Sequence, residues 1–593
     1  MHKLLLRLWK HLSRKKKLHF SSFFILMLIG SMLEVVSLSS ILPFLAAITD
    51  INSIKAYPFI SDILAYYHLT EPKQVVLLLT VVFIAAILIS GGTRLLLLFL
   101  GTKLSFSSGH ELSVDIYRRT LSQTYESHTN RNSSEIIAGI STKVSSVTMI
   151  LKNSVLLLNS FVLIIIVSVA LILLNPIIAI LSAVSFIIFY GLVTWLVHGK
   201  LKVNSNHIST ESTKAIKIVQ EGMNGIRDII LDSSQNLYCA MFSKSDLKLK
   251  NAQSSNIFIA ASPKFLMESF GMIVVAMIAF SLYSTDNSFA NSLPFLGALA
   301  IGAQRMLPAA QQSFSAWSSI TGAKYVLIDV LELLDQSELI ISPETDIKPL
   351  PLKSTIELTN LSFRYNINQH NALSNVNIKI EKGTKVAFIG STGSGKSTAI
   401  DLIMGLLKPT TGHIAIDGLI LKDKYLRNWQ KSISHVPQSV FLSDTTIEKN
   451  IIFDTHANTK DSKLLENVLD QAQLLDFVKN KQKKYNTNVG ESGVNLSGGQ
   501  IQRIGIARAL YKKANILVLD EATSALDSIT EKRVLKAISE NNKDLTIIIV
   551  THRLSTIKNC DVIYEFEEGK VISQGTYDEL LNSSVSFEKM TKT

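Results

Sequence analysis

One stretch of nine residues, GSTGSGKST at positions 390–398, combines glycines with a lysine and several hydroxyl side chains. It follows the apolar run KVAFI and leads into AIDLIMGL, which is compatible with a helix. Glycines allow successive backbone N–H groups to point at one anion, and the N-terminus of the helix adds a favourable dipole. The stretch matches G-x-x-x-x-G-K-[ST] in its required strand–loop–helix context, so it predicts a nucleotide-binding loop.

Each position of this loop has an expected role. The lysine reaches the terminal phosphates of the nucleotide, and the hydroxyl that follows it ligates magnesium. The expected nucleotide-binding residues of the loop are Gly390, Ser391, Thr392, Gly393, Ser394, Gly395, Lys396, Ser397 and Thr398, and Ser397 is also an expected metal ligand.

Two further apolar runs end in residues suited to phosphate chemistry. The run ILVL at positions 516–519 is typical of a buried parallel strand, and it ends in Asp520 and Glu521. Asp520 is placed to hold magnesium and Glu521 to polarise an attacking water. A second run, TIIIV, leads to His552, which is placed to contact the terminal phosphate. Taken alone, His552 would more often be a structural residue.

A third motif, LSGGQIQRIGIARAL at positions 496–510, opens a predicted helix with Ser497, Gly498, Gly499 and Gln500. Small residues at a helix N-terminus leave backbone N–H groups open to an anion. The segment therefore predicts a second phosphate-contacting site.

The elements that must position these motifs divide the chain in two. At 593 residues it is too long for a single hydrophobic core, and only 18% of its residues are charged. Charge-poor runs of the length needed to cross a bilayer concentrate before about residue 320. Six spans are predicted, at positions 20–49, 75–100, two within 153–197 that are broken at Asn175 and Pro176, 257–283 and 292–316.

Basic residues at the ends of the spans set the expected orientation. RKKK at positions 14–17 and the pair Arg118 and Arg119 place the N-terminus in the cytoplasm. The net charge of +12 does not indicate a nucleic-acid partner, because no basic stripe interleaved with aromatic residues is present. Cys239 and Cys560 fall in segments expected to be cytoplasmic, so no disulfide framework is predicted.

The connections between spans differ in length on the two sides. The inner connections, 102–152 and 200–256, are long and helix-compatible, with chain reversals expected at 125–136 and 221–235. On the outer side, AYPFISDILAYYHL at 56–69 has apolar residues at helical spacing. A short amphipathic helix at the membrane interface and an ordinary loop helix packed on protein are both compatible with it.

Together these motifs resemble those of the ABC transporter family, in the exporter order of membrane spans first and ATPase last. In that resemblance Tyr365 in LSFRY stacks on adenine, and Gln438 in HVPQ contacts magnesium and assists catalysis beside Glu521 and His552. GESG at 490–493 resembles the exporter loop before the signature, with Ser492 where many exporters have arginine. The implied cofactors are ATP and Mg²⁺, the implied metal ligands are Ser397, Gln438 and Asp520, and the implied activity is ATP-driven translocation.

The resemblance also implies the fold and the domain boundaries. We expect an all-α six-helix transmembrane domain of ABC exporter type at residues 1–334, a linker at 335–354, and an α/β P-loop NTPase domain at 355–593. In the family, each ATP is sandwiched between the phosphate loop of one subunit and the Ser497–Gln500 signature of the other. This chain has one copy of each. A homodimer is favoured over a heterodimer, because Glu521, His552 and the signature are all intact.

Ionisable residues inside the spans are candidates for substrate contacts. Arg94, Lys264 and Arg305 could line a cavity that binds an anionic group, and the planar guanidinium of arginine suits phosphate oxygens. Alternatively, Glu34 and Glu268 neutralise these bases as buried structural pairs. Segments such as MLEVVSLSSILPFLAAI, SPKFLMESFG and QRMLPAAQQSF resemble bacterial flippases for lipid-linked oligosaccharides, which implies a polyprenyl-pyrophosphate substrate and the bacterial inner membrane.

Two classes of alternative remain open at this point. Within transport, the chain is also compatible with export of another lipid, a peptide or drugs. From another class, an ATP-gated channel or regulator would bind nucleotide without pumping, although an intact Glu521 argues against that role.

Overall fold

The computed structural model describes residues 1–41, 43–44, 48, 72–174, 176–285, 289–336, 347–366, 370–453 and 461–592. The chain divides into two compact units. The first consists of Met1–Gln123 and Ser127–Leu339, and the second of Thr124–Glu126 and Ile340–Thr593. The predicted outer segment at 56–69 lies outside the described residues.

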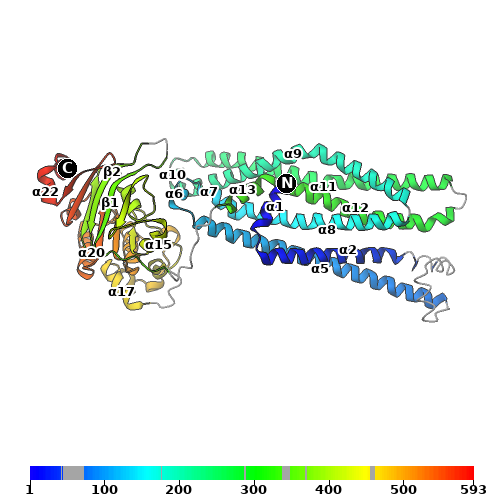
Figure 1. Ribbon diagram of the computed structural model, residues 1–593, viewed down its shortest axis with the longest axis horizontal. Coiled ribbons are helices and arrows are strands. Elements are labelled where there is room, and N and C mark those ends of the chain that lie inside the picture. Colours follow the sequence, from blue (N-terminus) through cyan, green and yellow to red (C-terminus); the bar gives the residue numbers. More distant parts are fainter. Residues whose placement is uncertain are drawn as a thin grey trace. The chain divides into compact units, whose positions relative to one another are not determined.

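The first unit is built from long helices that run side by side (Figure 1). They are α2 (Arg14–Ser39), α5 (Pro72–Leu121), α8 (Val144–Leu174), α9 (Pro176–Asn224), α11 (Gln235–Thr285) and α12 (Phe289–Gly322). Each coincides with one predicted span, although α2 ends at Ser39, within the first predicted span at 20–49. A bilayer needs only about 20 residues per helix, whereas α5, α9 and α11 have 50, 49 and 51 residues, so these helices continue well past the membrane. This length agrees with the long helical connections expected on the inner side.

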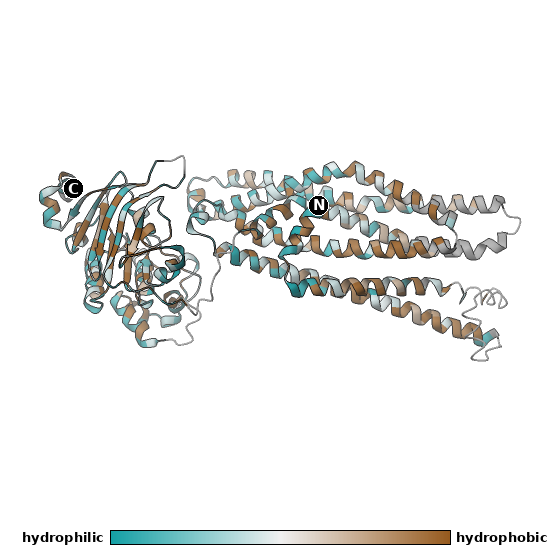
Figure 2. Cartoon of the chain, viewed as in Figure 1, coloured by the Kyte–Doolittle hydropathy of each residue, from teal (hydrophilic) through white to brown (hydrophobic). Residues whose placement is uncertain are grey.

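Three helices among the described residues are long and apolar enough to cross a membrane: Arg14–Ser37, Lys73–Leu121 and Ser133–Ala170. Hydrophobic residues cover much of the length of α5 and α8 (Figure 2). Many large apolar side chains on these helices, such as Leu88 and Phe161, are exposed in the single chain. Lipid or a second chain must cover them, because water would not solvate so large an apolar surface.

The helices pack in pairs, α8 along α12, α9 along α11 and α2 along α5. Pro176 is the first residue of α9, a position that tolerates proline because its N–H would have no partner there. The expected reversals coincide with breaks between short helices: α6 (Tyr125–Thr129), α7 (Ser133–Ala138), a π-helical turn at Gly139–Lys143, and α10 (Ile226–Leu231).

An apolar cluster joins the two ends of this unit's sequence. Leu8 and Leu12 from α1 (His2–His11) and its C-cap pack with Leu331 and Leu334 of α13 (Lys324–Leu334). Arg7 and His11 pair with Asp335, directly after α13. The N-terminal helix is thereby fixed to the end of α13 and to the first residue of the predicted linker.

The described residues of the second unit form two sheets. The smaller is antiparallel with strand order β2 (Leu373–Glu381), β1 (Thr355–Phe363), β4 (Thr411–Ile416) and β5 (Leu419–Ile420). The larger has the order β10 (Lys570–Gly575), β9 (Val562–Glu567), β3 (Lys385–Gly390), β8 (Thr546–Val550), β7 (Ile516–Asp520) and β6 (Ile433–Val436). All neighbours in the larger sheet are parallel except β10 and β9.

Helices and two apolar clusters surround these sheets. The helices are α14 (Lys396–Ile403), α15 (Asp423–Lys431), α16 (Ile447–Ile452), α17 (Ser462–Gln471), α18 (Leu475–Lys479), α19 (Gly498–Tyr511), α20 (Ser528–Asn541), α21 (Leu554–Ile557), α22 (Tyr577–Ser583) and α23 (Val585–Lys592). One cluster contains Phe388 and Phe566, and the other contains Leu517 and Ile504. Because β3, β7 and β8 are parallel neighbours, the loops after their carboxyl ends converge at one edge of the sheet.

Candidate nucleotide site and transmembrane pocket

The predicted phosphate loop connects β3 to α14. Gly395 caps the N-terminus of α14 in the left-handed region, with φ of 103°. A Cβ atom at this position would lie 2.6 Å from the Leu373 side chain and 2.9 Å from the carbonyl oxygen of Ala372. Both the conformation and the space therefore require glycine at residue 395. This tight turn leads directly into the helix whose N-terminus faces the expected phosphates.

Lys396 is folded over the loop that precedes it. Its Nζ atom donates to the carbonyl oxygens of Gly390 at 2.8 Å and of Ser391 at 2.7 Å, and the residue is only 6% exposed. Burial lowers the pKa of the Lys396 ammonium, although the charges of Glu521 and Asp520 act in the opposite direction. A buried cation held by backbone carbonyls fits a terminal phosphate, which would supply the negative charge that the loop lacks.

Glu521 contacts both of the other predicted catalytic residues, Gln438 and His552. Its Oε2 atom accepts a hydrogen bond of 2.7 Å from Nε2 of Gln438, and its Oε1 atom lies 3.2 Å from Nε2 of His552. The three side chains come from the loops after β6, β7 and β8. Glu521 also has a positive φ of 47°, a conformation that non-glycine residues seldom adopt and that often marks functional sites.

Asp520 ends β7 beside this group. Burial raises the pKa of its carboxyl, the neighbouring charge of Glu521 raises it further, and Lys396 lowers it. Burial and the neighbouring negative charge disfavour the ionised form of this carboxyl, and a bound cation would stabilise it. The donor set expected for magnesium, Ser397, Gln438 and Asp520, therefore fits the ion in chemistry, since all three supply oxygen ligands.

Tyr365 lies beside the phosphate-loop helix. Its hydroxyl makes a 3.0 Å hydrogen bond with the hydroxyl of Thr398, and its ring packs edge-on against Phe363 with centroids 5.0 Å apart. The residue is 40% exposed, so one part of the ring remains open. This placement agrees with a stacking surface for a base whose phosphates lie on the loop.

Ser497 caps α19 as the motif predicted. Its hydroxyl accepts from the backbone N–H of Gln500, and the Gln500 side chain accepts from the backbone N–H of Ser497, which completes a capping box. Gly499 lies close to the backbone of Ala525. Within the described residues, no hydrogen bond or ion pair joins residues 497–500 to the phosphate loop.

Two residues that no sequence motif marks, Glu531 and Arg553, support this site. Glu531 of α20 is 1% exposed and accepts hydrogen bonds of 2.7 Å from Thr523, Thr556 and Arg553. Arg553 also donates to the carbonyl oxygens of Ser524 and Leu526. The Glu531–Arg553 pair therefore ties the loop after Glu521 to the loop that carries His552. Nothing in the local motif marks Glu531, because its partners lie on other elements.

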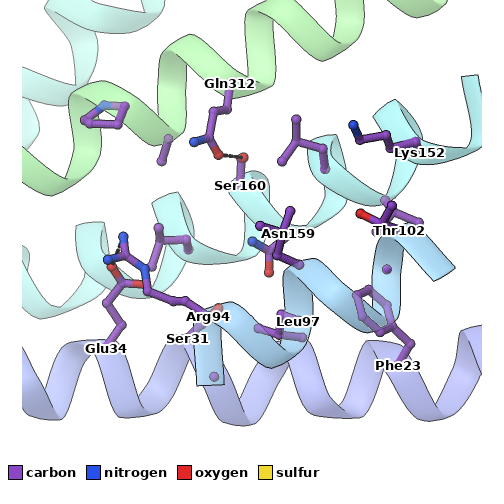
Figure 3. A pocket seen from close by; sticks show the side chains of 18 residues that line it. Phe23, Ser31, Glu34, Arg94, Leu97, Thr102, Lys152, Asn159, Ser160 and Gln312 are labelled. Atoms are coloured by element: carbon purple, nitrogen blue, oxygen red, sulfur yellow. Dashed lines mark hydrogen bonds and ion pairs between the residues drawn. The ribbon is translucent and has the colours of Figure 1, made fainter. Parts of the chain in front are cut away.

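Of the predicted substrate residues, Arg94 and Lys264 do not line the same pocket. Arg94 lines a pocket between α2, α5, α8 and α12, where its guanidinium lies 2.9 Å from Oε1 of Glu34 (Figure 3). Lys264 lies 3.9 Å from Glu268 one helical turn away and does not line that pocket. The side chain of Arg305 lies outside the described residues. Arg94 and Lys264 thus pair with Glu34 and Glu268, as in the alternative of structural ion pairs that the sequence also allowed.

Cys239 and Cys560 are both free, as expected. The fold and the site together define a protein with a helical membrane region and an α/β nucleotide-binding domain on one polypeptide. The chain matches the model of the ABC transporter transmembrane region over residues 20–298 and that of the ABC transporter over residues 373–524. It belongs to the ABC transporter family, and the predicted fold class is confirmed.

Named relatives and a solved structure extend this comparison. The chain is 30% identical to the heterocyst differentiation ATP-binding protein HepA of Nostoc sp. over 68% of this chain and 65% of that protein. It is 40% identical to the ATP-dependent lipid A-core flippase of Cupriavidus pinatubonensis over 39% of each chain. The matches thus span less than two thirds of the length of either relative. A bacterial Atm1-family ABC exporter with ATP bound has the same fold, with a TM-score of 0.79, 20% identity, and coverage of 97% of this chain and 98% of that one.

Proposed function

We propose that the chain is an ATP-hydrolysing exporter that flips a polyprenyl-pyrophosphate-linked oligosaccharide or polysaccharide precursor across the bacterial inner membrane. One observation carries the substrate class: a pocket that holds a half-exposed arginine, Arg94, and several uncharged polar side chains lies among strongly apolar helices. Polar and ionisable groups are expensive in a membrane, so a pocket that collects them indicates a polar head group as its ligand.

Hydrolysis follows from the residues around Glu521. Its carboxylate orients a water toward the terminal phosphorus atom and takes up a proton as the new P–O bond forms and the bond to ADP breaks. Gln438 and His552 hold the carboxylate from two sides. Lys396 stabilises the charge on the phosphate oxygens, and Tyr365 positions the base. A bound magnesium ion, held by Ser397, Gln438 and Asp520, would neutralise further phosphate charge.

A second copy of the chain completes the site in this proposal. Ser497, Gly498, Gly499 and Gln500 would contact the terminal phosphate of ATP on the partner's loop, because among the described residues of one chain they make no hydrogen bond to their own phosphate loop. The exposed helix N-terminus of α19 is suited to that contact. Closure of two ATPase domains on ATP, and their release after hydrolysis, would then switch access to the membrane pocket.

The finer substrate assignment has one competitor with specific support. Several relatives are named ATP-dependent lipid A-core flippase, including one from Haemophilus influenzae that is 32% identical over 55% of this chain and 54% of that protein. Those names favour a lipid substrate over a peptide or drugs, and they leave a different glycolipid as the second candidate. An ATP-gated channel is disfavoured. A gate needs to bind nucleotide but has less need to hydrolyse it, and the carboxylate arrangement at Glu521 is suited to hydrolysis.

The proposal is tested by ATPase activity of the purified full chain in lipid, with and without a polyprenyl-pyrophosphate oligosaccharide. We expect the lipid to stimulate turnover of the wild type, Glu521→Gln to be inactive, and the Arg94→Ala, Arg305→Ala double variant to lose stimulation. Arg118→Ala is the matched control, because Arg118 is an exposed arginine in the last turn of α5 and does not line the pocket. A wild type whose turnover never responds to the lipid would rule out this substrate.

A further inference from the structure

The pocket around Arg94 contains more uncharged polar groups than a phosphate site requires. It has a volume of about 440 Å³, within the range of small-molecule sites. Its polar lining residues come from all four surrounding helices, and Figure 3 shows them directed around one space. They are Ser31 and Glu34 of α2, Arg94 and Thr102 of α5, Lys152, Asn159 and Ser160 of α8, and Gln312 of α12.

The charge of Arg94 is already balanced at one end of this space. Glu34 is 5% exposed at its side chain, and its carboxylate lies 2.9 Å from the arginine. A pyrophosphate placed at the Arg94 end of the pocket would approach the buried carboxylate of Glu34, which repels it. A guanidinium and a carboxylate together instead offer donors and acceptors side by side. That combination suits a neutral group that can both donate and accept hydrogen bonds.

Carboxamides and hydroxyls continue the same chemistry along the pocket. The Ser160 hydroxyl donates to the Oε1 atom of Gln312 at 3.3 Å, so the amide N–H groups of Gln312 remain as donors. The Asn159 side chain is directed into the same pocket (Figure 3), and within the described residues its amide makes no hydrogen bond. The Phe23 ring adds a flat apolar surface to the lining.

A cation stands at the far end. Lys152 precedes Asn159 by seven residues on α8, a separation of about 10 Å along the helix. Lys152 forms no ion pair with a carboxylate of the described residues. An anionic group at Lys152 would place whatever is attached to it beside Asn159 and Gln312.

We propose that this pocket binds a sugar residue of the transported head group, with Asn159, Gln312 and the Glu34–Arg94 pair reading its hydroxyls and Lys152 contacting the adjoining phosphate. This inference rests on the proposed function and adds that the sugar, and not only the pyrophosphate, is recognised inside a single subunit. Vicinal hydroxyls donate and accept hydrogen bonds at once, which matches the mixture of amides, carboxylate and guanidinium present here.

The test compares two lipids on the full chain in lipid nanodiscs, a polyprenyl-pyrophosphate oligosaccharide and the same polyprenyl pyrophosphate without sugar. The readout is the lipid concentration that half-saturates the stimulation of ATPase activity. For the Asn159→Ala, Gln312→Ala double variant we expect this concentration to rise about tenfold for the sugar-bearing lipid and to stay within about twofold for the bare lipid. Asn153→Ala, on the same helix but outside the pocket, should respond to both lipids as the wild type does.

Each other outcome has a distinct meaning. In one, the double variant responds to the sugar-bearing lipid like the wild type, and in another, its half-saturating concentration rises equally for both lipids. In either case the sugar site is wrong, while the proposed substrate stands. If the wild type responds to neither lipid, the proposed function fails and the sugar site fails with it. Folding of the double variant is checked by its unfolding temperature, and Asn159→Asp, which keeps the size and an acceptor, provides a second variant expected to retain partial discrimination.

Discussion

Oε1 of Glu521 lies 3.2 Å from Nε2 of His552, although the two residues follow different strands of the large sheet. The other oxygen of Glu521 accepts from Gln438. A carboxylate held from both sides beside the phosphate loop is positioned before any substrate arrives, and such preorganisation is what makes a general base effective.

Replacing Glu521 by glutamine should remove this base while keeping its size. We expect ATP turnover to fall at least about 100-fold with nucleotide affinity retained, because the amide cannot accept the proton of the attacking water. Steady-state ATPase assays and binding of a fluorescent nucleotide analogue measure the two quantities separately. Glu540→Gln, an exposed glutamate on α20, is the control. Equal loss of turnover and binding would show that Glu521 is structural.

The proposed ATP site consists of the phosphate loop of one chain and residues 497–500 of the other. It can be tested with mixed dimers purified through two different tags. One dimer pairs a Lys396→Ala chain with a Ser497→Arg chain, and the other pairs the wild type with a chain that carries both substitutions. If ATP is bound between two chains, the first dimer keeps one intact site and the second keeps none. We therefore expect about half of the wild-type turnover or less from the first and background from the second. The reverse order would place each site within a single chain.

Glu531 should matter for catalysis without touching nucleotide. Its carboxylate is buried and paired with Arg553, so Glu531→Ala removes the counter-charge of the arginine and should destabilise the ATPase domain by about 3 kcal/mol. Because the pair joins the loops of Glu521 and His552, we expect Glu531→Gln, which keeps acceptor and shape, to lower kcat more than it raises KM. Thermal unfolding and steady-state kinetics measure both effects. Unchanged kinetics in a folded Glu531→Gln variant would contradict the positioning role.

Asp401 of α14 predicts a pH dependence of stability. Burial, followed by the charge of Asp520, raises the pKa of its carboxyl from 3.8 to about 6. Between these two pKa values the folded state keeps the proton of Asp401 while the unfolded state releases it. The free energy of unfolding therefore carries no penalty from this group below about pH 4, and the penalty grows to its full size as the pH rises to about 6.

Asp401→Asn should therefore stabilise the nucleotide-free protein at pH 7.5 by about 1–2 kcal/mol, an amount reduced for partial solvent screening. At pH 5 the gain should be clearly smaller. Denaturant unfolding at both pH values provides the measurement, and Asp544→Asn, an exposed aspartate, serves as the control. A gain of the same size at both pH values would show that ionisation of Asp401 is not its cause.

The features that depend on neighbouring residues were predictable from the sequence. The phosphate loop at 390–398 and the cap at Ser497 are read from contiguous residues, because their geometry arises from local backbone freedom and local hydrogen bonds. The six long helices follow from apolar runs of bilayer length, and the buried strands before Asp520 and His552 follow from their β-branched composition.

Pairings between distant residues required the tertiary structure. Gln438 and Glu521 are separated by 83 residues and meet only because β6 and β7 are parallel neighbours. Glu531 looked like any charged residue of an amphipathic helix until the fold buried it beneath Arg553. The charges of Glu34 and Arg94 were visible in the sequence, but their contact depended on how α2 packs along α5. The sequence by itself determined the local chemistry of each motif, whereas packing decided which charges neutralise one another, since electrostatic energy depends on separation in space and not along the chain.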